Sequence, residues 1–435
     1  MSATSPLVTG SRSRLRPLLA AAVGNIVEWF DFTIYATFAV YFSPLFFPSA
    51  DPTASLLSTF AVFAVGFFVR PLGGWLIGAY ADRQGRRKVL LLTIVLMTVP
   101  AFVIGISPTY ASVGIVAPIV LVLARMLQGF AAGGEAGGAM AYLSEIAPEH
   151  RKGLYSSLWY TTVVLGMVLA SLTGFVLTRL LAAEAMGEWG WRIPFLVGGA
   201  AGLLSLWVRR AMVETSDAVV DGTAAARPAG LGTLLSEFPR ETLRVILLMA
   251  GAATAFYTFV SYMPTHLINS VGLAPATTFG LHTVALVIFM VLLPTFGMLS
   301  DRIGRRPLGF VFAIGGGVAI YPLSLALSER WYVSLAVDLA FLTLTACIFS
   351  VLAVIMTDLF PSRMRAMGVG APYNLATAIF GGTAPFLLTW LAGQGRADTY
   401  FIYLACLVLL SAVGLGLTSN SRTRPNNVAT PVAGA

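Results

Sequence analysis

Long apolar segments alternate with short charged loops along the whole chain, and this alternation sets the expected architecture. An α-helix of about 20 mostly apolar residues crosses the hydrocarbon core of a bilayer. Helices are expected because lipid cannot satisfy unpaired backbone groups. The pattern predicts twelve membrane-spanning helices, at residues 18–42, 56–79, 89–107, 113–139, 154–180, 192–210, 242–268, 276–299, 307–327, 331–357, 367–393 and 398–419.

Composition excludes a water-soluble protein. Apolar residues make up 57% of the 435 residues and charged residues 11%, against roughly 45–50% and 25% in soluble proteins. The mean hydropathy is +0.83. Both cysteines, Cys347 and Cys406, fall within apolar segments, where a thiol behaves as a small hydrophobe. We therefore predict no disulfide and no metal site.

The net charge of +8 reports membrane topology, because most lysines and arginines lie in short loops. One side of the predicted membrane carries 21 of them and the other side four. Positive residues favour the cytoplasmic side, so both termini are predicted to be cytoplasmic. Nucleic acid is not an expected partner. The predicted domains are a six-helix half at 1–208, a cytoplasmic linker at 209–241, and a second six-helix half with a short tail at 242–435.

A ten-residue loop pattern occurs twice and indicates an internal duplication. Gly78–Arg87 and Gly297–Arg306 both read G-x-x-x-D-R-x-G-R-R. A second pair follows, in which Glu145 and Asp358 each stand three residues before a proline. Each half contains an even number of helices, so the halves have the same orientation and form parallel repeats. The predicted fold is an all-α membrane protein of twelve helices in two parallel six-helix halves.

The aspartates of the duplicated loop, Asp82 and Asp301, could join neighbouring helices. An aspartate can accept hydrogen bonds from a helix N-terminus or pair with an arginine. The alternative is that the arginines only set topology. Gly78 and Gly297 suit close helix approach. The residues expected to gate or support conformational change are Asp82, Arg83, Arg86, Asp301, Arg302, Arg305, Arg70, Glu145 and Asp358.

Charged residues inside membrane helices are costly and mark function by default. Asn25, Glu28, Asp31 and Tyr35 follow one another at helical spacing. Arg125 lies near the middle of its segment, where its planar guanidinium could bind a carboxylate. The alternative is a structural ion pair with Glu28, Asp31 or Glu135.

Three acidic residues, Asp31, Glu28 and Glu135, are the candidate proton-coupling groups. Competition between a substrate anion and a carboxylate for one arginine would couple protonation to binding. Arg70 precedes Pro71, where the helix lacks a backbone hydrogen bond, so a structural role is also possible. Asp338 is a second-rank candidate for the pathway or for a pair between the halves.

Polar side chains in other segments could line a cavity, with helix packing as the alternative. The candidate substrate-binding residues are Arg125, Asn25, Tyr35, Gln128, Tyr160, Tyr257 and Asn374. His266 and His282 are expected at the surface. No phosphate loop, nucleophilic triad or metal-ligand cluster occurs in the sequence, so neither an enzyme nor a cofactor is predicted.

The duplicated loop resembles the signature of the major facilitator superfamily. Several stretches are similar to its metabolite:proton symporter branch, namely Gly24–Phe32, Arg70–Gly74, Gln128–Phe130 with Gly133–Glu135, Trp189–Phe195 and Ala378–Gly382. The resemblance covers residues 18–415 and extends to α-ketoglutarate and citrate permeases. It implies alternating access with one site between the halves. It also implies that Arg125 is a substrate-binding base and that Glu28 and Asp31 form an acidic motif.

The expected function is proton-coupled import of a small organic acid, a di- or tricarboxylate such as α-ketoglutarate or citrate. The alternatives are a proton-coupled importer of an osmolyte such as proline or betaine, and a drug-type proton antiporter. The expected partners are the substrate, protons and the lipid bilayer. We expect a monomer that crosses a bacterial inner membrane many times.

Overall fold

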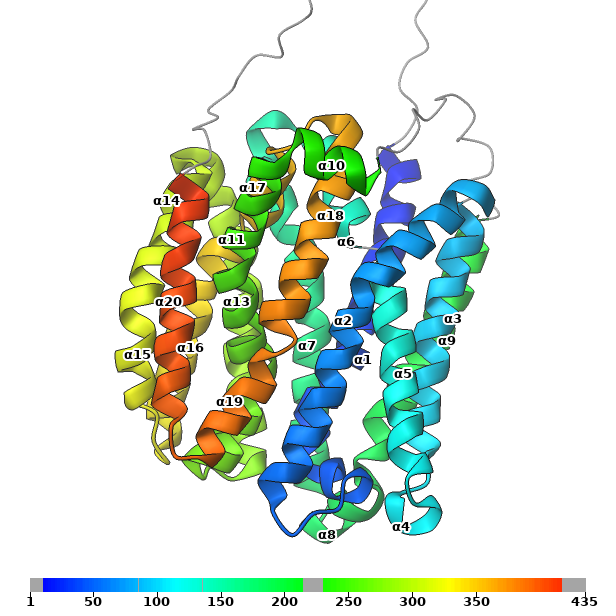
Figure 1. Cartoon of the computed structure of the whole chain (residues 1–435), viewed down its shortest axis with the longest axis vertical. Coiled ribbons are helices and arrows are strands. Elements are labelled where there is room, and N and C mark those ends of the chain that lie inside the picture. The colour runs from blue at the N-terminus through cyan, green and yellow to red at the C-terminus, as the bar shows by residue number, and fades with distance from the viewer. Residues whose placement is uncertain (1–10, 85, 135, 214–229, 417–435) are drawn as a thin grey trace, which may run out of the picture.

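The computed structural model describes residues 11–84, 86–134, 136–213 and 230–416. Side chains are described over the same ranges except 11–21, 78–79, 81–90, 208–213 and 363. The described residues form helices and connecting loops, without a strand. The helices run roughly side by side in one bundle (Figure 1).

The first half of the bundle ends before the undescribed residues 214–229. Its elements are α1 Ser11–Phe46, α2 Pro52–Gln84, α3 Arg86–Ile106, α4 Tyr110–Val113, α5 Val116–Ala132, α6 Ala136–Ile146, η1 Glu149–Arg151, α7 Lys152–Leu180, α8 Ala183–Ala185, η2 Met186–Gly190 and α9 Arg192–Val213.

The second half is preceded by the short helix α10 Leu231–Glu237. Its elements are α11 Pro239–Phe256, η3 Tyr257–Tyr262, α12 Met263–His266, η4 Leu267–Val271, α13 Pro275–Ile303, α14 Arg305–Phe310, η5 Val311–Gly316, α15 Gly317–Leu325, α16 Trp331–Phe349, α17 Leu352–Thr357, η6 Ser362–Met364, α18 Arg365–Ala376, η7 Thr377–Gly381, α19 Ala384–Gly393 and α20 Ala397–Gly416.

Every predicted span has a helical counterpart. By length and composition, nine stretches of the described residues could cross a membrane. Two more predicted spans correspond to the shorter apolar stretches Leu91–Ile106 and Arg192–Trp207, and the first corresponds to α1. Large apolar side chains such as Trp75, Leu204 and Trp207 are exposed on the outside of the bundle, as expected for a surface that faces lipid. The all-α prediction is confirmed.

Five elements are π-helical turns, which the sequence pattern did not predict. They are η2, η3, η4, η5 and η7. In a π-helical turn the hydrogen bond spans one residue more than in an α-helix, and such turns are frequent at functional sites. The segments predicted as continuous helices at 242–268, 307–327 and 367–393 therefore change register along their length.

Glycines bring α2 and α5 into backbone contact. A Cβ atom added at Gly66 would lie 3.1 Å from the Arg125 carbonyl oxygen, and one added at Gly74 would lie 2.9 Å from the Gly133 carbonyl oxygen. A Cβ at Gly129 would overlap the Gly66 carbonyl. Small residues allow this close approach within a membrane. The backbone position of Arg125 is thus fixed against α2.

We call the end of the bundle that carries α10, η1 and η6 the linker end; it lies uppermost in Figure 1. There Asp301 of α13 accepts hydrogen bonds from the backbone N–H groups of Gly153 (2.7 Å) and Leu154 (3.1 Å), at the start of α7. A Cβ at Gly153 would lie 2.5 Å from the Gly297 carbonyl oxygen. The two halves are therefore joined through a capped helix N-terminus, and the close approach expected of Gly297 is present.

Further contacts at the linker end involve the second repeated pattern. The Ser144 and Thr357 hydroxyls lie 3.1 Å apart, and Arg365 lies 3.8 Å from Glu145 across the halves. Asp358 instead pairs with Arg305, within the second half. The corresponding prolines, Pro148 and Pro361, each precede a single turn of 3₁₀ helix, so the sequence repeat is also a structural one.

Other residues expected to act in gating are less well placed or lie outside the description. Arg302 is exposed. The side chains of Asp82, Arg83 and Arg86 lie outside the described residues. The gating roles of all these residues stay predictions.

Candidate functional site

A chain of three polar side chains is buried inside the first half. Arg125 of α5 donates to the side-chain oxygen Oε1 of Gln128 (3.0 Å), and the Gln128 side-chain Nε2 donates to Asp31 Oδ2 of α1. Their exposed fractions are 0%, 1% and 4%. Gln128 follows Arg125 by three residues and therefore shares its helix face. The sequence placed all three among its candidates, and the structure brings them together.

Arg125 reaches Asp31 through Gln128 and does not pair with it directly. Among the described residues no ion pair includes Arg125, so the direct pair considered as an alternative is not formed within them. The guanidinium lies 4.3 Å from the ring centroids of Phe32 and Tyr35 and 5.3 Å from that of Phe63. Aromatic faces attract a cation. Its Nε and Nη2 atoms have no hydrogen-bond partner among the described residues.

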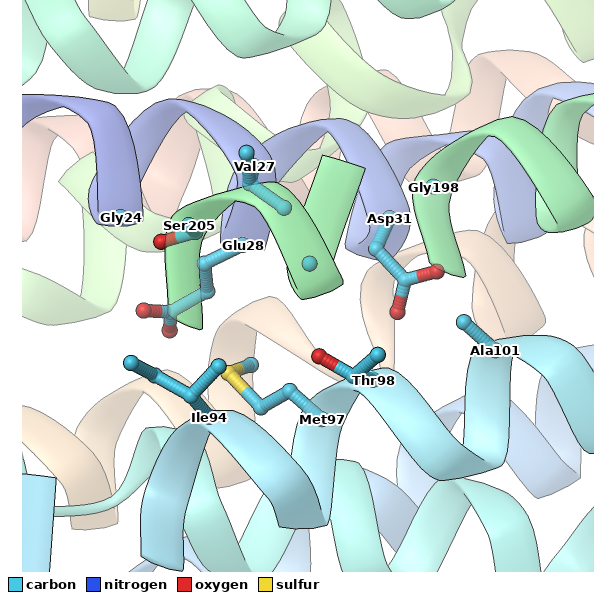
Figure 2. A pocket seen from close by; sticks show the side chains of 11 residues that line it. Gly24, Val27, Glu28, Asp31, Ile94, Met97, Thr98, Ala101, Gly198 and Ser205 are labelled. Atoms are coloured by element: carbon cyan, nitrogen blue, oxygen red, sulfur yellow. The ribbon is translucent and has the colours of Figure 1, made fainter. Parts of the chain in front are cut away.

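Glu28 and Asp31 face a pocket within the first half. Figure 2 shows both carboxyl groups extending from α1 toward α3. The pocket is lined on its other side by α9. Gly198 of α9 permits this approach, because a Cβ there would lie 3.1 Å from Asp31 Oδ1. Two candidate proton groups therefore line one space that does not involve the second half.

A second, narrow cavity lies between the halves. We call it the central cavity. Two of the predicted substrate-binding residues, Tyr160 and Tyr257, line it, and their hydroxyls have no hydrogen-bond partner among the described residues. The other lining residues are Trp29, Met249, Ala253, Phe256, Phe349, Tyr373 and Thr377. The sequence did not single these out, because an aromatic residue in an apolar helix looks the same whether it packs in a core or walls a cavity.

Three contacts join the halves in addition to those at the linker end. Toward the linker end, the Asn374 amide donates to the Gly133 carbonyl oxygen across the halves (2.9 Å). Elsewhere along the interface, the Thr265 hydroxyl donates to the Ala36 carbonyl oxygen (3.3 Å), and the Phe60 ring meets the Tyr262 ring edge-on at 5.1 Å. The halves therefore contact each other at several points along their interface.

The remaining candidates make contacts within the first half or lie outside the description. The Asn25 amide donates to the Thr162 hydroxyl of α7 (2.7 Å). The Tyr35 hydroxyl donates to the Thr59 carbonyl oxygen of α2 (3.0 Å). Glu135 is not among the described residues. Asn25 and Tyr35 of α1, which were expected on one helix face, thus contact different helices.

Arg70 is buried beside the central cavity. Its exposed fraction is 4%. The guanidinium lies 4.1 Å from the ring centroid of Phe67, 4.4 Å from that of Phe32 and 5.9 Å from that of Trp29. Trp29 is one of the cavity walls. Within the described residues no group of His, Cys, Asp and Glu side chains suits a metal ion.

A buried pair in the second half corrects one expectation. His266 and His282 were expected at the surface, but their exposed fractions are 4% and 1%. His282 Nδ1 lies 2.8 Å from Asp338 Oδ2, and its Nε2 lies 3.3 Å from the Val260 carbonyl oxygen in η3. A histidine in an apolar segment gives no signal of burial by itself. The sequence signal was Asp338, because a carboxylate inside an apolar segment needs a hydrogen-bond donor.

Asp338→Asn is expected to destabilise the second half. The substitution removes the charged acceptor that faces His282 while keeping the side-chain shape, and a hydrogen bond to a charged group contributes about 1.5–3 kcal/mol. Denaturant unfolding of the detergent-solubilised protein should show a loss of that order. The exposed Asp398, in the first turn of α20, provides the control, because Asp398→Asn should change the stability by less than about 1 kcal/mol. Equal effects of the two substitutions would contradict the prediction.

Comparison with known proteins adds a family match and several full-length relatives. The family described as "Sugar (and other) transporter" matches residues 18–216 and 208–418. The alpha-ketoglutarate permease of Escherichia coli is 38% identical over 403 residues, covering 92% of this chain and 93% of the relative. The citrate-proton symporter of Klebsiella pneumoniae is 32% identical (94% of each chain). A proline/betaine transporter of Salmonella typhimurium is also 32% identical (96% and 86%).

The solved structures support the fold alone. A crystal structure of a D-xylose-proton symporter superposes with a TM-score of 0.72 at 19% identity, covering 92% of this chain and 97% of the other. The two family matches, one to each half of the chain, agree with the duplicated architecture.

Proposed function

This chain belongs to the "Sugar (and other) transporter" family of the major facilitator superfamily, and on that premise we propose that it imports a small organic acid together with protons. The substrate class is a di- or tricarboxylate, such as α-ketoglutarate or citrate. Support comes from the relatives described as an alpha-ketoglutarate permease and a citrate-proton symporter. The central cavity between the halves is the proposed substrate site.

The observation that carries the proposal is the buried chain Arg125–Gln128–Asp31. Asp31 borders the pocket within the first half, whereas the neighbouring Trp29 borders the central cavity. A proton that binds Asp31 cancels its charge and changes its hydrogen bond with Gln128. Because Gln128 also holds Arg125, protonation alters the electrostatic environment next to the substrate site. We assign Asp31 the main proton-coupling role, with Glu28 and Glu135 as further candidates.

The proposed transport cycle alternates between states that open at opposite ends. Asp301 at the linker end holds the halves together while the other end opens. With the linker end on the cytoplasmic side, both termini lie in the cytoplasm of a bacterium and the chain acts as a monomer in the inner membrane. Asn25, Tyr35 and Asn374 support the site through their contacts with neighbouring helices.

A second candidate function is import of a zwitterion such as betaine. The walls of the central cavity include six aromatic residues, and aromatic faces bind quaternary ammonium groups. Relatives described as proline/betaine transporters are 31–32% identical to this chain.

Uptake into proteoliposomes tests the proposal. With an acidic exterior, labelled α-ketoglutarate or citrate should accumulate above equilibrium, because inward proton flow supplies the driving force, and a protonophore should abolish the accumulation. Labelled betaine and proline serve as the comparison substrates. Accumulation of betaine without either acid would favour the second candidate. Acid uptake that is unchanged by the protonophore would contradict proton coupling.

A further inference from the structure

Two buried arginines share one aromatic ring in the first half. The guanidinium of Arg70 lies 4.4 Å and that of Arg125 4.3 Å from the centroid of Phe32. Asp31 is the one acidic residue among the buried polar groups of α1, α2 and α5 in the described part, and it is hydrogen-bonded to Gln128. Glu28 of α1 is half-buried. A buried positive charge is costly unless an anion or strong hydrogen bonds compensate it, so each arginine needs such partners.

Arg125 and Arg70 differ in what surrounds them. The rings over Arg125 belong to Phe32, Tyr35 and Phe63, and none of these lines the central cavity. Arg125 is also bonded to Gln128, inside the first half. The charge at Arg125 is thus already part of the chain that leads to Asp31.

Arg70 does not line the cavity itself but lies behind one of its walls. Its guanidinium is 5.9 Å from the ring centroid of Trp29, which lines the cavity. Arg70 and Tyr257 contact the same ring: the guanidinium lies 4.1 Å and the Tyr257 ring centroid 4.9 Å from the centroid of Phe67. Tyr373 lines the cavity together with Tyr257. Arg70 Nε has no hydrogen-bond partner among the described residues.

The backbone of α2 around Arg70 restricts the conformation of its side chain. Pro71 follows directly inside α2. The Arg70 carbonyl lies against Gly133, the residue after α5, where an added Cβ would overlap it. The backbone on both sides of Arg70 is therefore constrained, and its side chain points among rings that leave little rotamer freedom.

We propose that Arg70 binds a carboxylate of the transported substrate, with the hydroxyls of Tyr257 and Tyr373 as additional donors. The inference rests on the proposed function and names the binding group of that site. A guanidinium presents parallel N–H groups that match the two oxygens of a carboxylate, and a phenol can donate to the same group. Arg125 remains with Asp31 in proton coupling. The carboxylate is common to organic acids and to betaine, so the assignment concerns the chemistry that both share.

The test measures binding to the purified protein in detergent. Wild type, Arg70→Gln and Arg70→Lys are titrated with α-ketoglutarate, citrate and glycine betaine, and then with choline, the analogue of betaine that lacks a carboxylate. Arg179→Gln is the matched control, because Arg179 is exposed and also lies over a ring, that of Phe175. Thermal unfolding of each variant shows whether it is folded.

For the substrate that wild type binds, Arg70→Gln should weaken affinity about tenfold to a hundredfold. Arg70→Lys should lose part of this affinity, because an ammonium lacks the planar fork. Choline binding, where present, should be the same in wild type and Arg70→Gln. If Arg70→Gln does not fold, Tyr373→Phe should still weaken binding of the carboxylate ligand and leave choline unaffected.

The two proposals fail in different ways. If the wild-type protein binds betaine but neither acid, the proposed substrate class is wrong. The betaine and choline titrations of the variants then still decide whether Arg70 binds a carboxylate. If Arg70→Gln folds and binds the carboxylate ligand as tightly as wild type, the assignment of Arg70 is overturned. Where Tyr373→Phe replaces that variant, wild-type affinity of Tyr373→Phe has the same meaning. Wild type that binds none of the three ligands contradicts both.

Discussion

Arg125→Ala is expected to abolish proton-driven uptake and to destabilise the protein. Arg125 is completely buried and bonded to Gln128, which holds Asp31. Its removal leaves the Asp31 carboxylate without a compensating cation in a low-dielectric interior. The hydrogen bond from the guanidinium to Gln128 is lost too, and a hydrogen bond to a charged group contributes about 1.5–3 kcal/mol. The free energy of unfolding should fall by about that amount, and accumulation of labelled substrate in proteoliposomes should drop to background.

Arg125→Lys distinguishes the contribution of the positive charge from that of the planar guanidinium in the same assay. It keeps a cation near Phe32 and Tyr35 but loses the planar donor set, so stability should recover more than uptake does. Arg179→Gln, at an exposed arginine, should behave as wild type. Uptake that survives Arg125→Ala in correctly folded protein would rule out the coupling mechanism.

Asp301→Ala is expected to open the linker end. The carboxylate of Asp301 accepts two backbone N–H groups from the first turn of α7, and each hydrogen bond to a charged group contributes about 1.5–3 kcal/mol. The favourable interaction of a carboxylate with a helix N-terminus is lost as well. The equilibrium should shift by at least about tenfold toward states in which the halves are separated at this end.

Spin labels at His150 and Ile303, both exposed and on opposite halves, would measure this opening in a background that lacks the exposed Cys406. The Asp301→Ala variant should populate longer distances. Asp51→Ala is the matched control, because Asp51 accepts from the Thr53 N–H at the start of α2 (2.8 Å), within one half. An unchanged distance distribution in Asp301→Ala would show that this contact does not hold the halves together.

The sequence predicted the helices and the duplicated loop well because both have strong local signals. A segment long and apolar enough to cross a bilayer has few alternatives to an α-helix. The position of Asp301 could be anticipated because a carboxylate in a glycine-containing loop needs donors, and a helix N-terminus supplies them. Arg125 was identifiable because arginine is rare inside such segments.

The contacts between distant residues were not predictable in the same way. The sequence suggested that Arg125 meets an acid, but not that Gln128 stands between them. His282 and Asp338 are 56 positions apart, so their pairing depends on how α13 packs against α16. The walls of the central cavity were missed because their aromatic residues are indistinguishable from core residues until the halves are assembled.

The π-helical turns beside the central cavity are positions where an insertion or a deletion can alter the cavity wall. Tyr257 and Thr377 are the first residues of η3 and η7, and both line the cavity. Such a turn contains one more residue than the α-helical turn it replaces. Loss of a single codon at either turn would leave a regular α-helical turn while the rest of the helix keeps its orientation. An insertion or a deletion there would change which side chain faces the cavity at that turn, with no substitution elsewhere in the wall.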